Sequence, residues 1–233
     1  MRIVTLPGVF SPISDTWLLA SALREQIVTA RTSVLDVCTG SGALAVCAAK
    51  RGARSVTAVD VSRRAVLTAA INARLNGVRV DAIRSDLFAQ LGDRAFDVIV
   101  SNPPYVPAGT DELPSRGPGR TWDAGRDGRA LLDRLLAGAP AHLRPGGRLL
   151  VVHSEICGID ETMERMRAGG LEPDIASRHR GPLGPLMRAR VAQLEAQGLI
   201  APGRRDEEVV VIRGTAPLRH QRVTVPARAA APA

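Results

Sequence analysis

The chain has 233 residues, of which 45% are hydrophobic and only 3% aromatic, and its formal net charge is +8. These values fit a globular protein with an aliphatic core, and they exclude a membrane-spanning chain because no apolar run is long enough to cross a bilayer. The three cysteines and four histidines are too scattered for a disulfide framework or a zinc site, so no metal is expected.

The positive charge comes almost wholly from arginine, because Lys50 is the only lysine. A basic surface favours an acidic partner, such as RNA or an acidic protein. A coding bias toward arginine explains the same composition equally well, so the charge does not select a substrate. The first residues lack the features of a signal peptide, and we expect a cytoplasmic protein.

Apolar residues recur at helical spacing over 15–30, with Asp15 as a candidate N-cap of that helix. Short apolar strands then alternate with helical stretches. The predicted strands span 33–37, 55–59, 80–84, 96–101, 148–153, 171–177 and 207–213. The predicted helices span 42–50, 63–75, 129–143 and 159–168, and the turn Pro145-Gly146-Gly147 follows the third of them.

This alternation predicts an α/β fold, a Rossmann-like doubly wound sheet of seven mostly parallel strands. We expect residues 1–214 to form a single domain that begins with an N-terminal segment and helix over 1–30. A Gly- and Pro-rich loop over 107–119 and an insertion over 181–206, with a basic helix at about 186–196, interrupt the alternation. Residues 215–233 are predicted to form a C-terminal tail with a disordered end.

A glycine-containing loop follows the first predicted strand. Gly40 and Gly42 permit a tight turn there and let a ligand lie against the backbone. Asp60 ends the second strand about 20 residues on, where a Rossmann-like fold places an acid for ribose hydroxyls. A strand-to-helix turn without a ligand is the plain alternative, and Asp60 favours ligand binding over it.

The acids around this loop indicate which ligand it binds. The pyrophosphate of a dinucleotide prefers G-x-G-x-x-G, which is absent here, and Asp36 at the strand end would repel it. The Asp36 carboxylate can instead hold the ammonium of a methionine moiety, so S-adenosylmethionine is favoured over NAD. Asp86 follows the third strand, where it can accept a hydrogen bond from the adenine amine. A helix N-cap before Leu87 is the alternative role for Asp86.

The sequence Asn102-Pro103-Pro104-Tyr105 follows the fourth predicted strand. The two prolines stop the strand and stiffen the chain, which presents the Asn102 side chain and the Pro103 carbonyl at the edge of the sheet. Two acceptors of this kind can take both N–H groups of an amide or aromatic amine and aim its nitrogen at a sulfonium methyl. Tyr105 can pack on the planar group. The motif therefore predicts an N-methyltransferase, and a plain Pro-Pro turn is the alternative.

These motifs resemble the HemK-type glutamine N5-methyltransferases that modify peptide-chain release factors. The resemblance runs from Val9 to about Leu171 and resumes over 208–213, and it is to the short branch that lacks a separate N-terminal helical domain. Two segments resemble this family in addition to the Asn-Pro-Pro-Tyr motif, which general amine methyltransferases share. They are residues 9–16, before the fold, and residues 121–129, after the motif.

The resemblance implies the fold of a class I S-adenosylmethionine-dependent methyltransferase, with residues 9–16 covering the cofactor. The cofactor contacts that it implies are Thr16, Asp36, Cys38, Asp60, Asp86, Leu87 and Asn102. We expect Gly40 and Gly42 of the glycine loop, and Val61 after Asp60, to contact the cofactor as well. Asn102 and Pro103 are implied to hold the glutamine amide of a release-factor Gly-Gly-Gln loop. Cys38 departs from the family, because it stands where the loop's first glycine is usual. Members of this branch often pair with a small zinc-binding activator on the edge of the third strand.

Three other functions stay open. Adenine and guanine amines fit the same two acceptors, so a nucleic-acid base methyltransferase is the first alternative, although few aromatic side chains are available for base stacking. The arginines that favour it gather around the insertion; they are Arg178, Arg180, Arg188, Arg190, Arg204 and Arg205. The second alternative is a small-molecule N-methyltransferase, and the third is a non-catalytic scaffold with the same fold.

Overall fold

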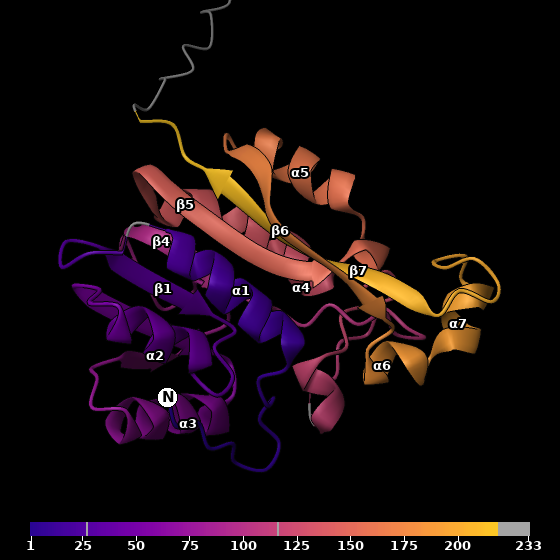
Figure 1. Cartoon of the computed structure of the whole chain (residues 1–233), viewed down its shortest axis with the longest axis horizontal. Coiled ribbons are helices and arrows are strands. Elements are labelled where there is room, and N and C mark those ends of the chain that lie inside the picture. Colours follow the sequence, from indigo (N-terminus) through magenta and orange to yellow (C-terminus); the bar gives the residue numbers. More distant parts are fainter. Residues whose placement is uncertain (27, 116, 219–233) are drawn as a thin grey trace, which may run out of the picture.

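A computed structural model describes residues 1–26, 28–115 and 117–218 (Figure 1). In this part of the chain, strands form one sheet in the order β3-β2-β1-β4-β5-β7-β6. Their bounds are β1 Ser33–Val37, β2 Ser55–Asp60, β3 Asp81–Arg84, β4 Phe96–Ser101, β5 Leu143–Ser154, β6 Glu172–Pro182 and β7 Asp206–Thr215. Strand β7 runs opposite to the six others, which confirms the predicted seven-stranded, mostly parallel sheet.

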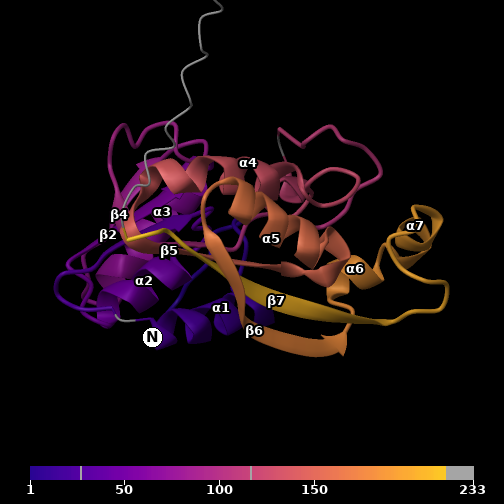
Figure 2. The same cartoon turned by 90° about the horizontal axis from the view of Figure 1, so that it is seen from above.

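Helices cover both faces of the sheet (Figures 1 and 2). The α-helices are α1 Ser14–Glu25, α2 Ala43–Lys50, α3 Arg63–Leu75, α4 Ala130–Gly138, α5 Ile159–Ala168, α6 Pro185–Arg188 and α7 Val191–Ala196. Short 3-10 helices are η1 Pro118–Thr121, η2 Ala139–His142 and η3 Glu155–Cys157. Helices α1 and α2 pack on one face and α4 and α5 on the other, with α3 beside α2.

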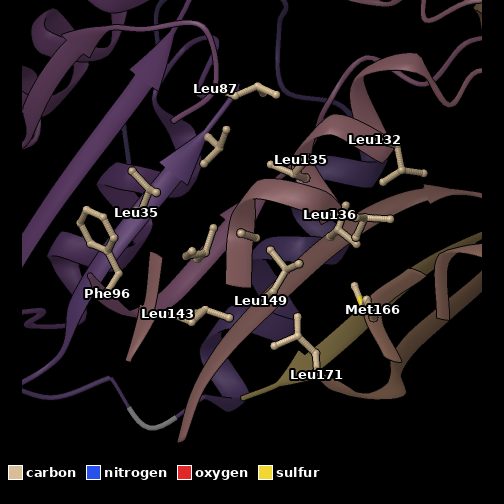
Figure 3. Close-up of a cluster of buried hydrophobic side chains, with 14 of the residues drawn as sticks. Leu35, Leu87, Phe96, Leu132, Leu135, Leu136, Leu143, Leu149, Met166 and Leu171 are labelled. Carbon is tan, nitrogen blue, oxygen red and sulfur yellow. The ribbon is translucent and has the colours of Figure 1, made fainter. Parts of the chain in front are cut away.

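Alternate residues of the central strands belong to two apolar layers, one on each face of the sheet, because successive side chains point to opposite faces of a strand. Val34 and Val98 pack with α1 and α2, whereas Leu35, Ile99 and Leu149 pack with α4 and α5 (Figure 3). Burial on both faces explains why these strands read as continuous apolar runs.

Two predicted helices end earlier than expected. Helix α1 stops at Glu25, because the side chains of Thr29 and Thr32 bond to nearby backbone groups in a turn. The predicted helix over 129–143 ends as α4 and continues as η2, which contains Pro140, a residue that cannot donate a backbone hydrogen bond.

Two further expectations were wrong. The N-cap of α1 is Ile13, and Asp15 lies inside the first turn, where its carboxylate has another partner described below. The Gly146-Gly147 turn lies inside the first half of β5, where the pairing with β4 is irregular between Phe96 and Val98.

The insertion closes the hairpin of β6 and β7. These strands reach Pro182 and Asp206, so the inserted part is residues 183–205. It forms two short helices, α6 and α7, instead of the single basic helix expected, and Arg190 between them is not helical. Of the predicted tail, residues 219–233 lie outside the described part of the chain.

Candidate functional site

The C-terminal ends of four parallel strands meet at one edge of the sheet. Val37 pairs with Val59 in β2 and with Ser101 in β4, and Asp60 pairs with Arg84 in β3. The loops after these strands therefore begin side by side, at the edge where open α/β sheets bind ligands. The predicted site residues after β1, β2, β3 and β4 are all brought to this edge.

Asp36 is fully buried near the end of β1. Its Oδ2 accepts hydrogen bonds from Thr39 Oγ1 at 2.5 Å and from the backbone N–H of Ala45 at 3.0 Å. Its Oδ1 is buried without a hydrogen-bond partner among the described residues. Burial raises the pKa of Asp36 from 3.8 to about 7. A buried acceptor in this state fits a cationic group such as an ammonium, which would satisfy Oδ1 and stabilise the charged carboxylate.

The backbone of the two predicted cofactor loops is strained. Cys38 and Leu87 have φ values of +58° and +48°, and among the described residues no others outside glycine have positive φ. Such conformations cost energy and concentrate at ligand sites. Gly42 has φ +79°, which fits the expected tight turn, and it has a packing role as well, because a Cβ there would lie 2.7 Å from Ala69 Cα. Its absent side chain thus serves the packing of α3 against the start of α2.

Asp60 connects the first two loops. Its Oδ2 accepts the N–H of Gly40 at 3.0 Å and its Oδ1 the N–H of Ser62 at 2.8 Å. Burial raises the pKa of Asp60. Because each carboxylate oxygen has a further lone pair, both can still accept from a diol such as ribose. The neighbouring Val61 is partly exposed beside this carboxylate.

Asp86 is exposed after β3, and its Oδ2 lies 2.8 Å from Arg134 Nη2 of α4. The N-cap alternative for Asp86 was wrong, since residues 87–90 form a turn and not a helix. In that turn Ser85 Oγ donates to the Leu87 carbonyl at 2.8 Å and accepts from the N–H of Gln90 at 3.1 Å. Arg134 leaves Asp86 Oδ1 available to a ligand amine.

Asn102 is held by α1. Its Nδ2 donates to Thr16 Oγ1 at 3.1 Å, while Ser101 Oγ donates to the Val37 carbonyl at 2.8 Å and fixes the end of β4. The Asn102 Oδ1 and the Pro103 carbonyl accept no hydrogen bond from any described residue. Two acceptors are thus available in adjacent residues, as the motif predicted.

Tyr105 is also tied to α1, because its hydroxyl donates to Asp15 Oδ2. Burial and the Asp15 carboxylate raise the pKa of Tyr105 well above its usual value, so the hydroxyl stays protonated. The first turn of α1 therefore holds both ends of the Asn-Pro-Pro-Tyr motif.

Residues 122–128 support the same motif from the other side. The N–H of Val106 donates to the Trp122 carbonyl at 2.8 Å, and the N–H of Ala124 donates back to Val106 at 3.1 Å. Gly128 has φ +76°, and a Cβ there would collide with the Tyr105 carbonyl oxygen. This pairing explains why 121–129 and the motif occur together.

The N-terminal segment lies along α3 and reaches the loop after β1. Asn72 bonds to both backbone groups of Val4 and to the Ser41 carbonyl, at 2.7–2.9 Å. A Cβ at Gly40 would lie 3.7 Å from the Phe10 carbonyl. The segment thus lies beside the predicted cofactor loop, which suits a covering role.

Sequence reasoning missed two buried ionisable groups near this edge. His153 near the end of β5 is fully buried, and burial lowers its pKa to about 4. Glu207 in β7 is 6% exposed, and burial raises its pKa; its Oε1 accepts the N–H of Gly184 at 2.7 Å. Neither residue has a neighbour in sequence that marks it, so only the fold reveals them.

The arginines around the insertion mostly face carboxylates of the same chain. Arg188 alone among them makes no ion pair within the described residues. The pairs are Arg178–Glu208, Arg180–Asp206, Arg190–Asp123, Arg204–Glu155, Arg204–Asp206 and Arg205–Glu195. Because these charges are compensated locally, the surface offers less attraction to a polyanion than the sequence indicated.

A cavity of about 430 Å³ lies at the opposite edge of the sheet, against Ser33, Ser55 and Phe96, the first residues of β1, β2 and β4. It is therefore separate from the site above. Within the described ranges, no group of three or more His, Cys, Asp or Glu residues is arranged to hold a metal ion. No helix in the same ranges is long and apolar enough to span a membrane.

Residues 1–113 match the methyltransferase small domain family. A Methanocaldococcus jannaschii protein assigned as a protein N5-glutamine methyltransferase is 34% identical over 181 residues, which are 78% of this chain and 90% of that protein. The Mycolicibacterium smegmatis release factor glutamine methyltransferase is 35% identical over 185 residues, 74% of this chain and 63% of that enzyme. The Bradyrhizobium diazoefficiens ribosomal protein uL3 glutamine methyltransferase is 46% identical over 129 residues, 52% of this chain and 40% of that enzyme. The chain thus spans 40% and 63% of the length of these two bacterial relatives.

Two solved structures share the fold. The T. thermophilus 16S rRNA methyltransferase in complex with AdoMet and guanosine has a TM-score of 0.63 at 22% identity, covering 91% of this chain and 46% of that one. The E. cuniculi Mtq2–Trm112 complex, responsible for the methylation of the eRF1 translation termination factor, has a TM-score of 0.60 at 23% identity. This match covers 90% of this chain and 99% of the chain in that structure.

Proposed function

The chain belongs to the HemK-type family of protein N5-glutamine methyltransferases, and on this premise we propose that it methylates the glutamine amide of a release-factor Gly-Gly-Gln loop. The chain is an S-adenosylmethionine-dependent methyltransferase. The observation that carries the acceptor proposal is the pair of available acceptors, Asn102 Oδ1 and the Pro103 carbonyl, next to an Asn102 amide whose Nδ2 is held by Thr16.

S-adenosylmethionine, when bound, supplies an electrophilic methyl group on a positively charged sulfur. We assign Asp36 Oδ1 to its ammonium, Asp60 to the ribose hydroxyls and Asp86 to the adenine amine. Cys38, Gly40, Val61 and Leu87 would contact it through the strained loops, and Thr16 and Asn102 from the acceptor side. Asp36 would then be ionised, because the ammonium stabilises the charge that burial disfavours.

The acceptor side of the reaction depends on orientation. An amide nitrogen has a delocalised lone pair and is a poor nucleophile, so it must be held at the correct angle to the methyl group. The Asn102 Oδ1 and the Pro103 carbonyl would accept the two amide N–H groups, and Pro104 keeps that geometry stiff. Tyr105, with its hydroxyl bound to Asp15, would place its ring against the planar amide.

A nucleic-acid acceptor is not favoured. The arginines that supported it are paired with carboxylates, except Arg188. The solved rRNA methyltransferase is similar in fold alone, at 22% identity.

We further propose that a small activator protein binds at β3, one of the two outer strands of the sheet. The residues of β3 are exposed or half-buried, and an outer strand has unpaired backbone groups that a partner can use. The fold similarity to the two-protein E. cuniculi complex supports looking for such a partner. Residues 1–214 would act as a single methyltransferase domain, which limited proteolysis would test by its resistance to cleavage between the strands.

The decisive experiment is transfer of radiolabelled methyl groups from S-adenosylmethionine to purified release factor. Label should appear in the release factor and disappear when the glutamine of its Gly-Gly-Gln loop is replaced by alanine. Parallel reactions contain ribosomal RNA and bulk cell protein without release factor. Label confined to RNA, or label in release factor that survives the glutamine substitution, would contradict the proposal.

A further inference from the structure

Residues 183–205, here named the clamp segment, pack against the chain that follows the Asn-Pro-Pro-Tyr motif. A separate apolar cluster joins them: Leu183, Met187 and Leu194 are at most 3% exposed and contact Val106 and Ile156. Tyr105 and Trp122 pack at the border of this cluster. The segment is therefore continuous with the wall of the proposed acceptor site.

The base of the clamp segment is closed. The N–H of Leu183 donates to the Arg205 carbonyl at 2.9 Å, and Glu207 Oε1 accepts the N–H of Gly184 at 2.7 Å. Arg204 forms ion pairs with Glu155 and with Asp206, 3.2 Å away in the second case. The segment thus has a defined position relative to β7 and η3 instead of being a loose hairpin tip.

Two side chains of the clamp segment hold the backbone after Tyr105. Arg190 Nη1 donates to the Pro107 carbonyl at 2.8 Å, and its Nη2 lies 2.6 Å from Asp123 Oδ1. Gln197 Nε2 donates to the Ala108 carbonyl at 3.0 Å. The Arg190 and Asp123 side chains are 23% and 17% exposed, so solvent screens this pair only weakly.

Arg190 connects the two segments that pair with each other here. Pro107 belongs to the segment after the Asn-Pro-Pro-Tyr motif, and Asp123 belongs to the segment that pairs with it. A planar guanidinium can bind a carbonyl and a carboxylate at once, which a lysine ammonium does less well. The position of Arg190 between α6 and α7 allows this reach, since the helix is interrupted there.

We propose that the clamp segment fixes the wall of the acceptor site through Arg190, which is a positioning residue for binding of the acceptor protein. This inference rests on the proposed function in taking a protein as the acceptor. Among the described residues, the polar side-chain partners of Arg190 are Pro107 and Asp123, and neither is assigned to the cofactor. Loss of Arg190 should thus weaken acceptor binding and leave cofactor affinity unchanged.

The test compares Arg190→Gln, Arg190→Lys and Arg188→Ala in the full chain. Arg188 is the matched control, because it lies two residues away, is exposed and makes no ion pair within the described residues. The KM for release factor should rise by roughly tenfold to a hundredfold in Arg190→Gln, with a smaller change in kcat. Arg190→Lys should recover part of the loss, and Arg188→Ala should behave as wild type. Calorimetry with S-adenosylmethionine should give the same Kd for all four proteins.

Hydrogen–deuterium exchange without any acceptor provides a second measurement. The backbone N–H groups of Val106, Ala108 and Ala124 should exchange faster in Arg190→Gln, while those of β1 stay protected. If the wild type does not methylate release factor, but exchange at these groups is faster in Arg190→Gln, the positioning role of Arg190 is supported and the proposed acceptor is wrong. If the wild type methylates release factor and neither KM nor exchange changes in Arg190→Gln, the clamp inference is wrong.

Discussion

The side-chain nitrogen of Asn102 donates to Thr16 Oγ1 over 3.1 Å, although the two residues are 86 positions apart in the chain. This contact decides which end of the Asn102 amide faces the acceptor site, because the nitrogen is occupied and the oxygen is available. The preceding residue of α1, Asp15, accepts a hydrogen bond from the Tyr105 hydroxyl. In the proposed function, the N-terminal helix would thus belong to the acceptor site as well as cover the cofactor.

Thr16→Val should lower kcat without unfolding the protein. Valine has the shape of threonine but cannot accept the Asn102 hydrogen bond, so the amide would no longer be held in one orientation. One neutral hydrogen bond contributes about 1 kcal/mol, which corresponds to roughly a fivefold loss. Steady-state kinetics would measure it, and Thr16→Ser should retain wild-type kcat. Equal kcat in all three proteins would show that Thr16 does not orient Asn102.

Asn102→Ala should abolish most methyl transfer and leave much of the cofactor affinity. It removes one of two groups that hold the acceptor nitrogen, and losses of about 10²–10³-fold in kcat are usual for such a group. Single-turnover kinetics with a pre-bound cofactor would separate this effect from binding. Full turnover by Asn102→Ala would exclude the mechanism above.

Asp60→Asn should weaken cofactor binding more than catalysis. Hydrogen bonds to a charged group contribute about 1.5–3 kcal/mol, so we expect the Kd to rise roughly 10- to 100-fold. Calorimetry measures this directly, and Asp81→Asn is the control, because Asp81 begins β3 at the far edge of the sheet and pairs with Arg94. An unchanged Kd for Asp60→Asn would contradict the ribose assignment.

Asp36 should make the stability of the cofactor-free protein fall with rising pH. Its pKa is about 7 in the folded protein and near 3.8 when unfolded, so between these values the folded state binds the extra proton. The contribution of Asp36 to the free energy of unfolding is fully present below about pH 4 and is lost as the pH rises through 7. The Tm should therefore decline between pH 5 and 8, and Asp36→Asn should flatten that decline. A decline of the same slope in the variant would assign the effect to another group.

Gly128→Ala should inactivate the enzyme more than its position on a loop suggests. A Cβ at Gly128 would collide with the Tyr105 carbonyl and displace the motif, whereas Gly77 has φ +67° and open space around it. Gly77→Ala is thus the control for backbone strain alone, which costs about 1 kcal/mol. Methyl transfer should be lost in Gly128→Ala and kept in Gly77→Ala, measured at equal folded fraction. Loss in both variants would mean that strain, and not the Tyr105 contact, is responsible.

Local patterns predicted the regular part of the fold well. The bounds of β1, β4, α3 and α5 coincide with the predicted ones, because their apolar periods and their end signals agree. Two of the errors fall where a single residue overrides a pattern. Pro140 converts the end of a predicted α-helix into a 3-10 helix, and the interruption at Arg190 divides the inserted helix in two.

The order of short motifs along the chain was enough to predict the sheet and the cofactor and to propose the Asn-Pro-Pro-Tyr acceptor site, because each depends on a few residues at fixed spacing after a strand. What the sequence could not give is which distant groups complete that site. The Thr16–Asn102 and Arg190–Pro107 contacts join positions far apart in the chain, and the pKa of Asp36 depends on burial by several elements. Such contacts have no local signature, so only the packing of α1 and of the clamp segment against the end of β4 decides them.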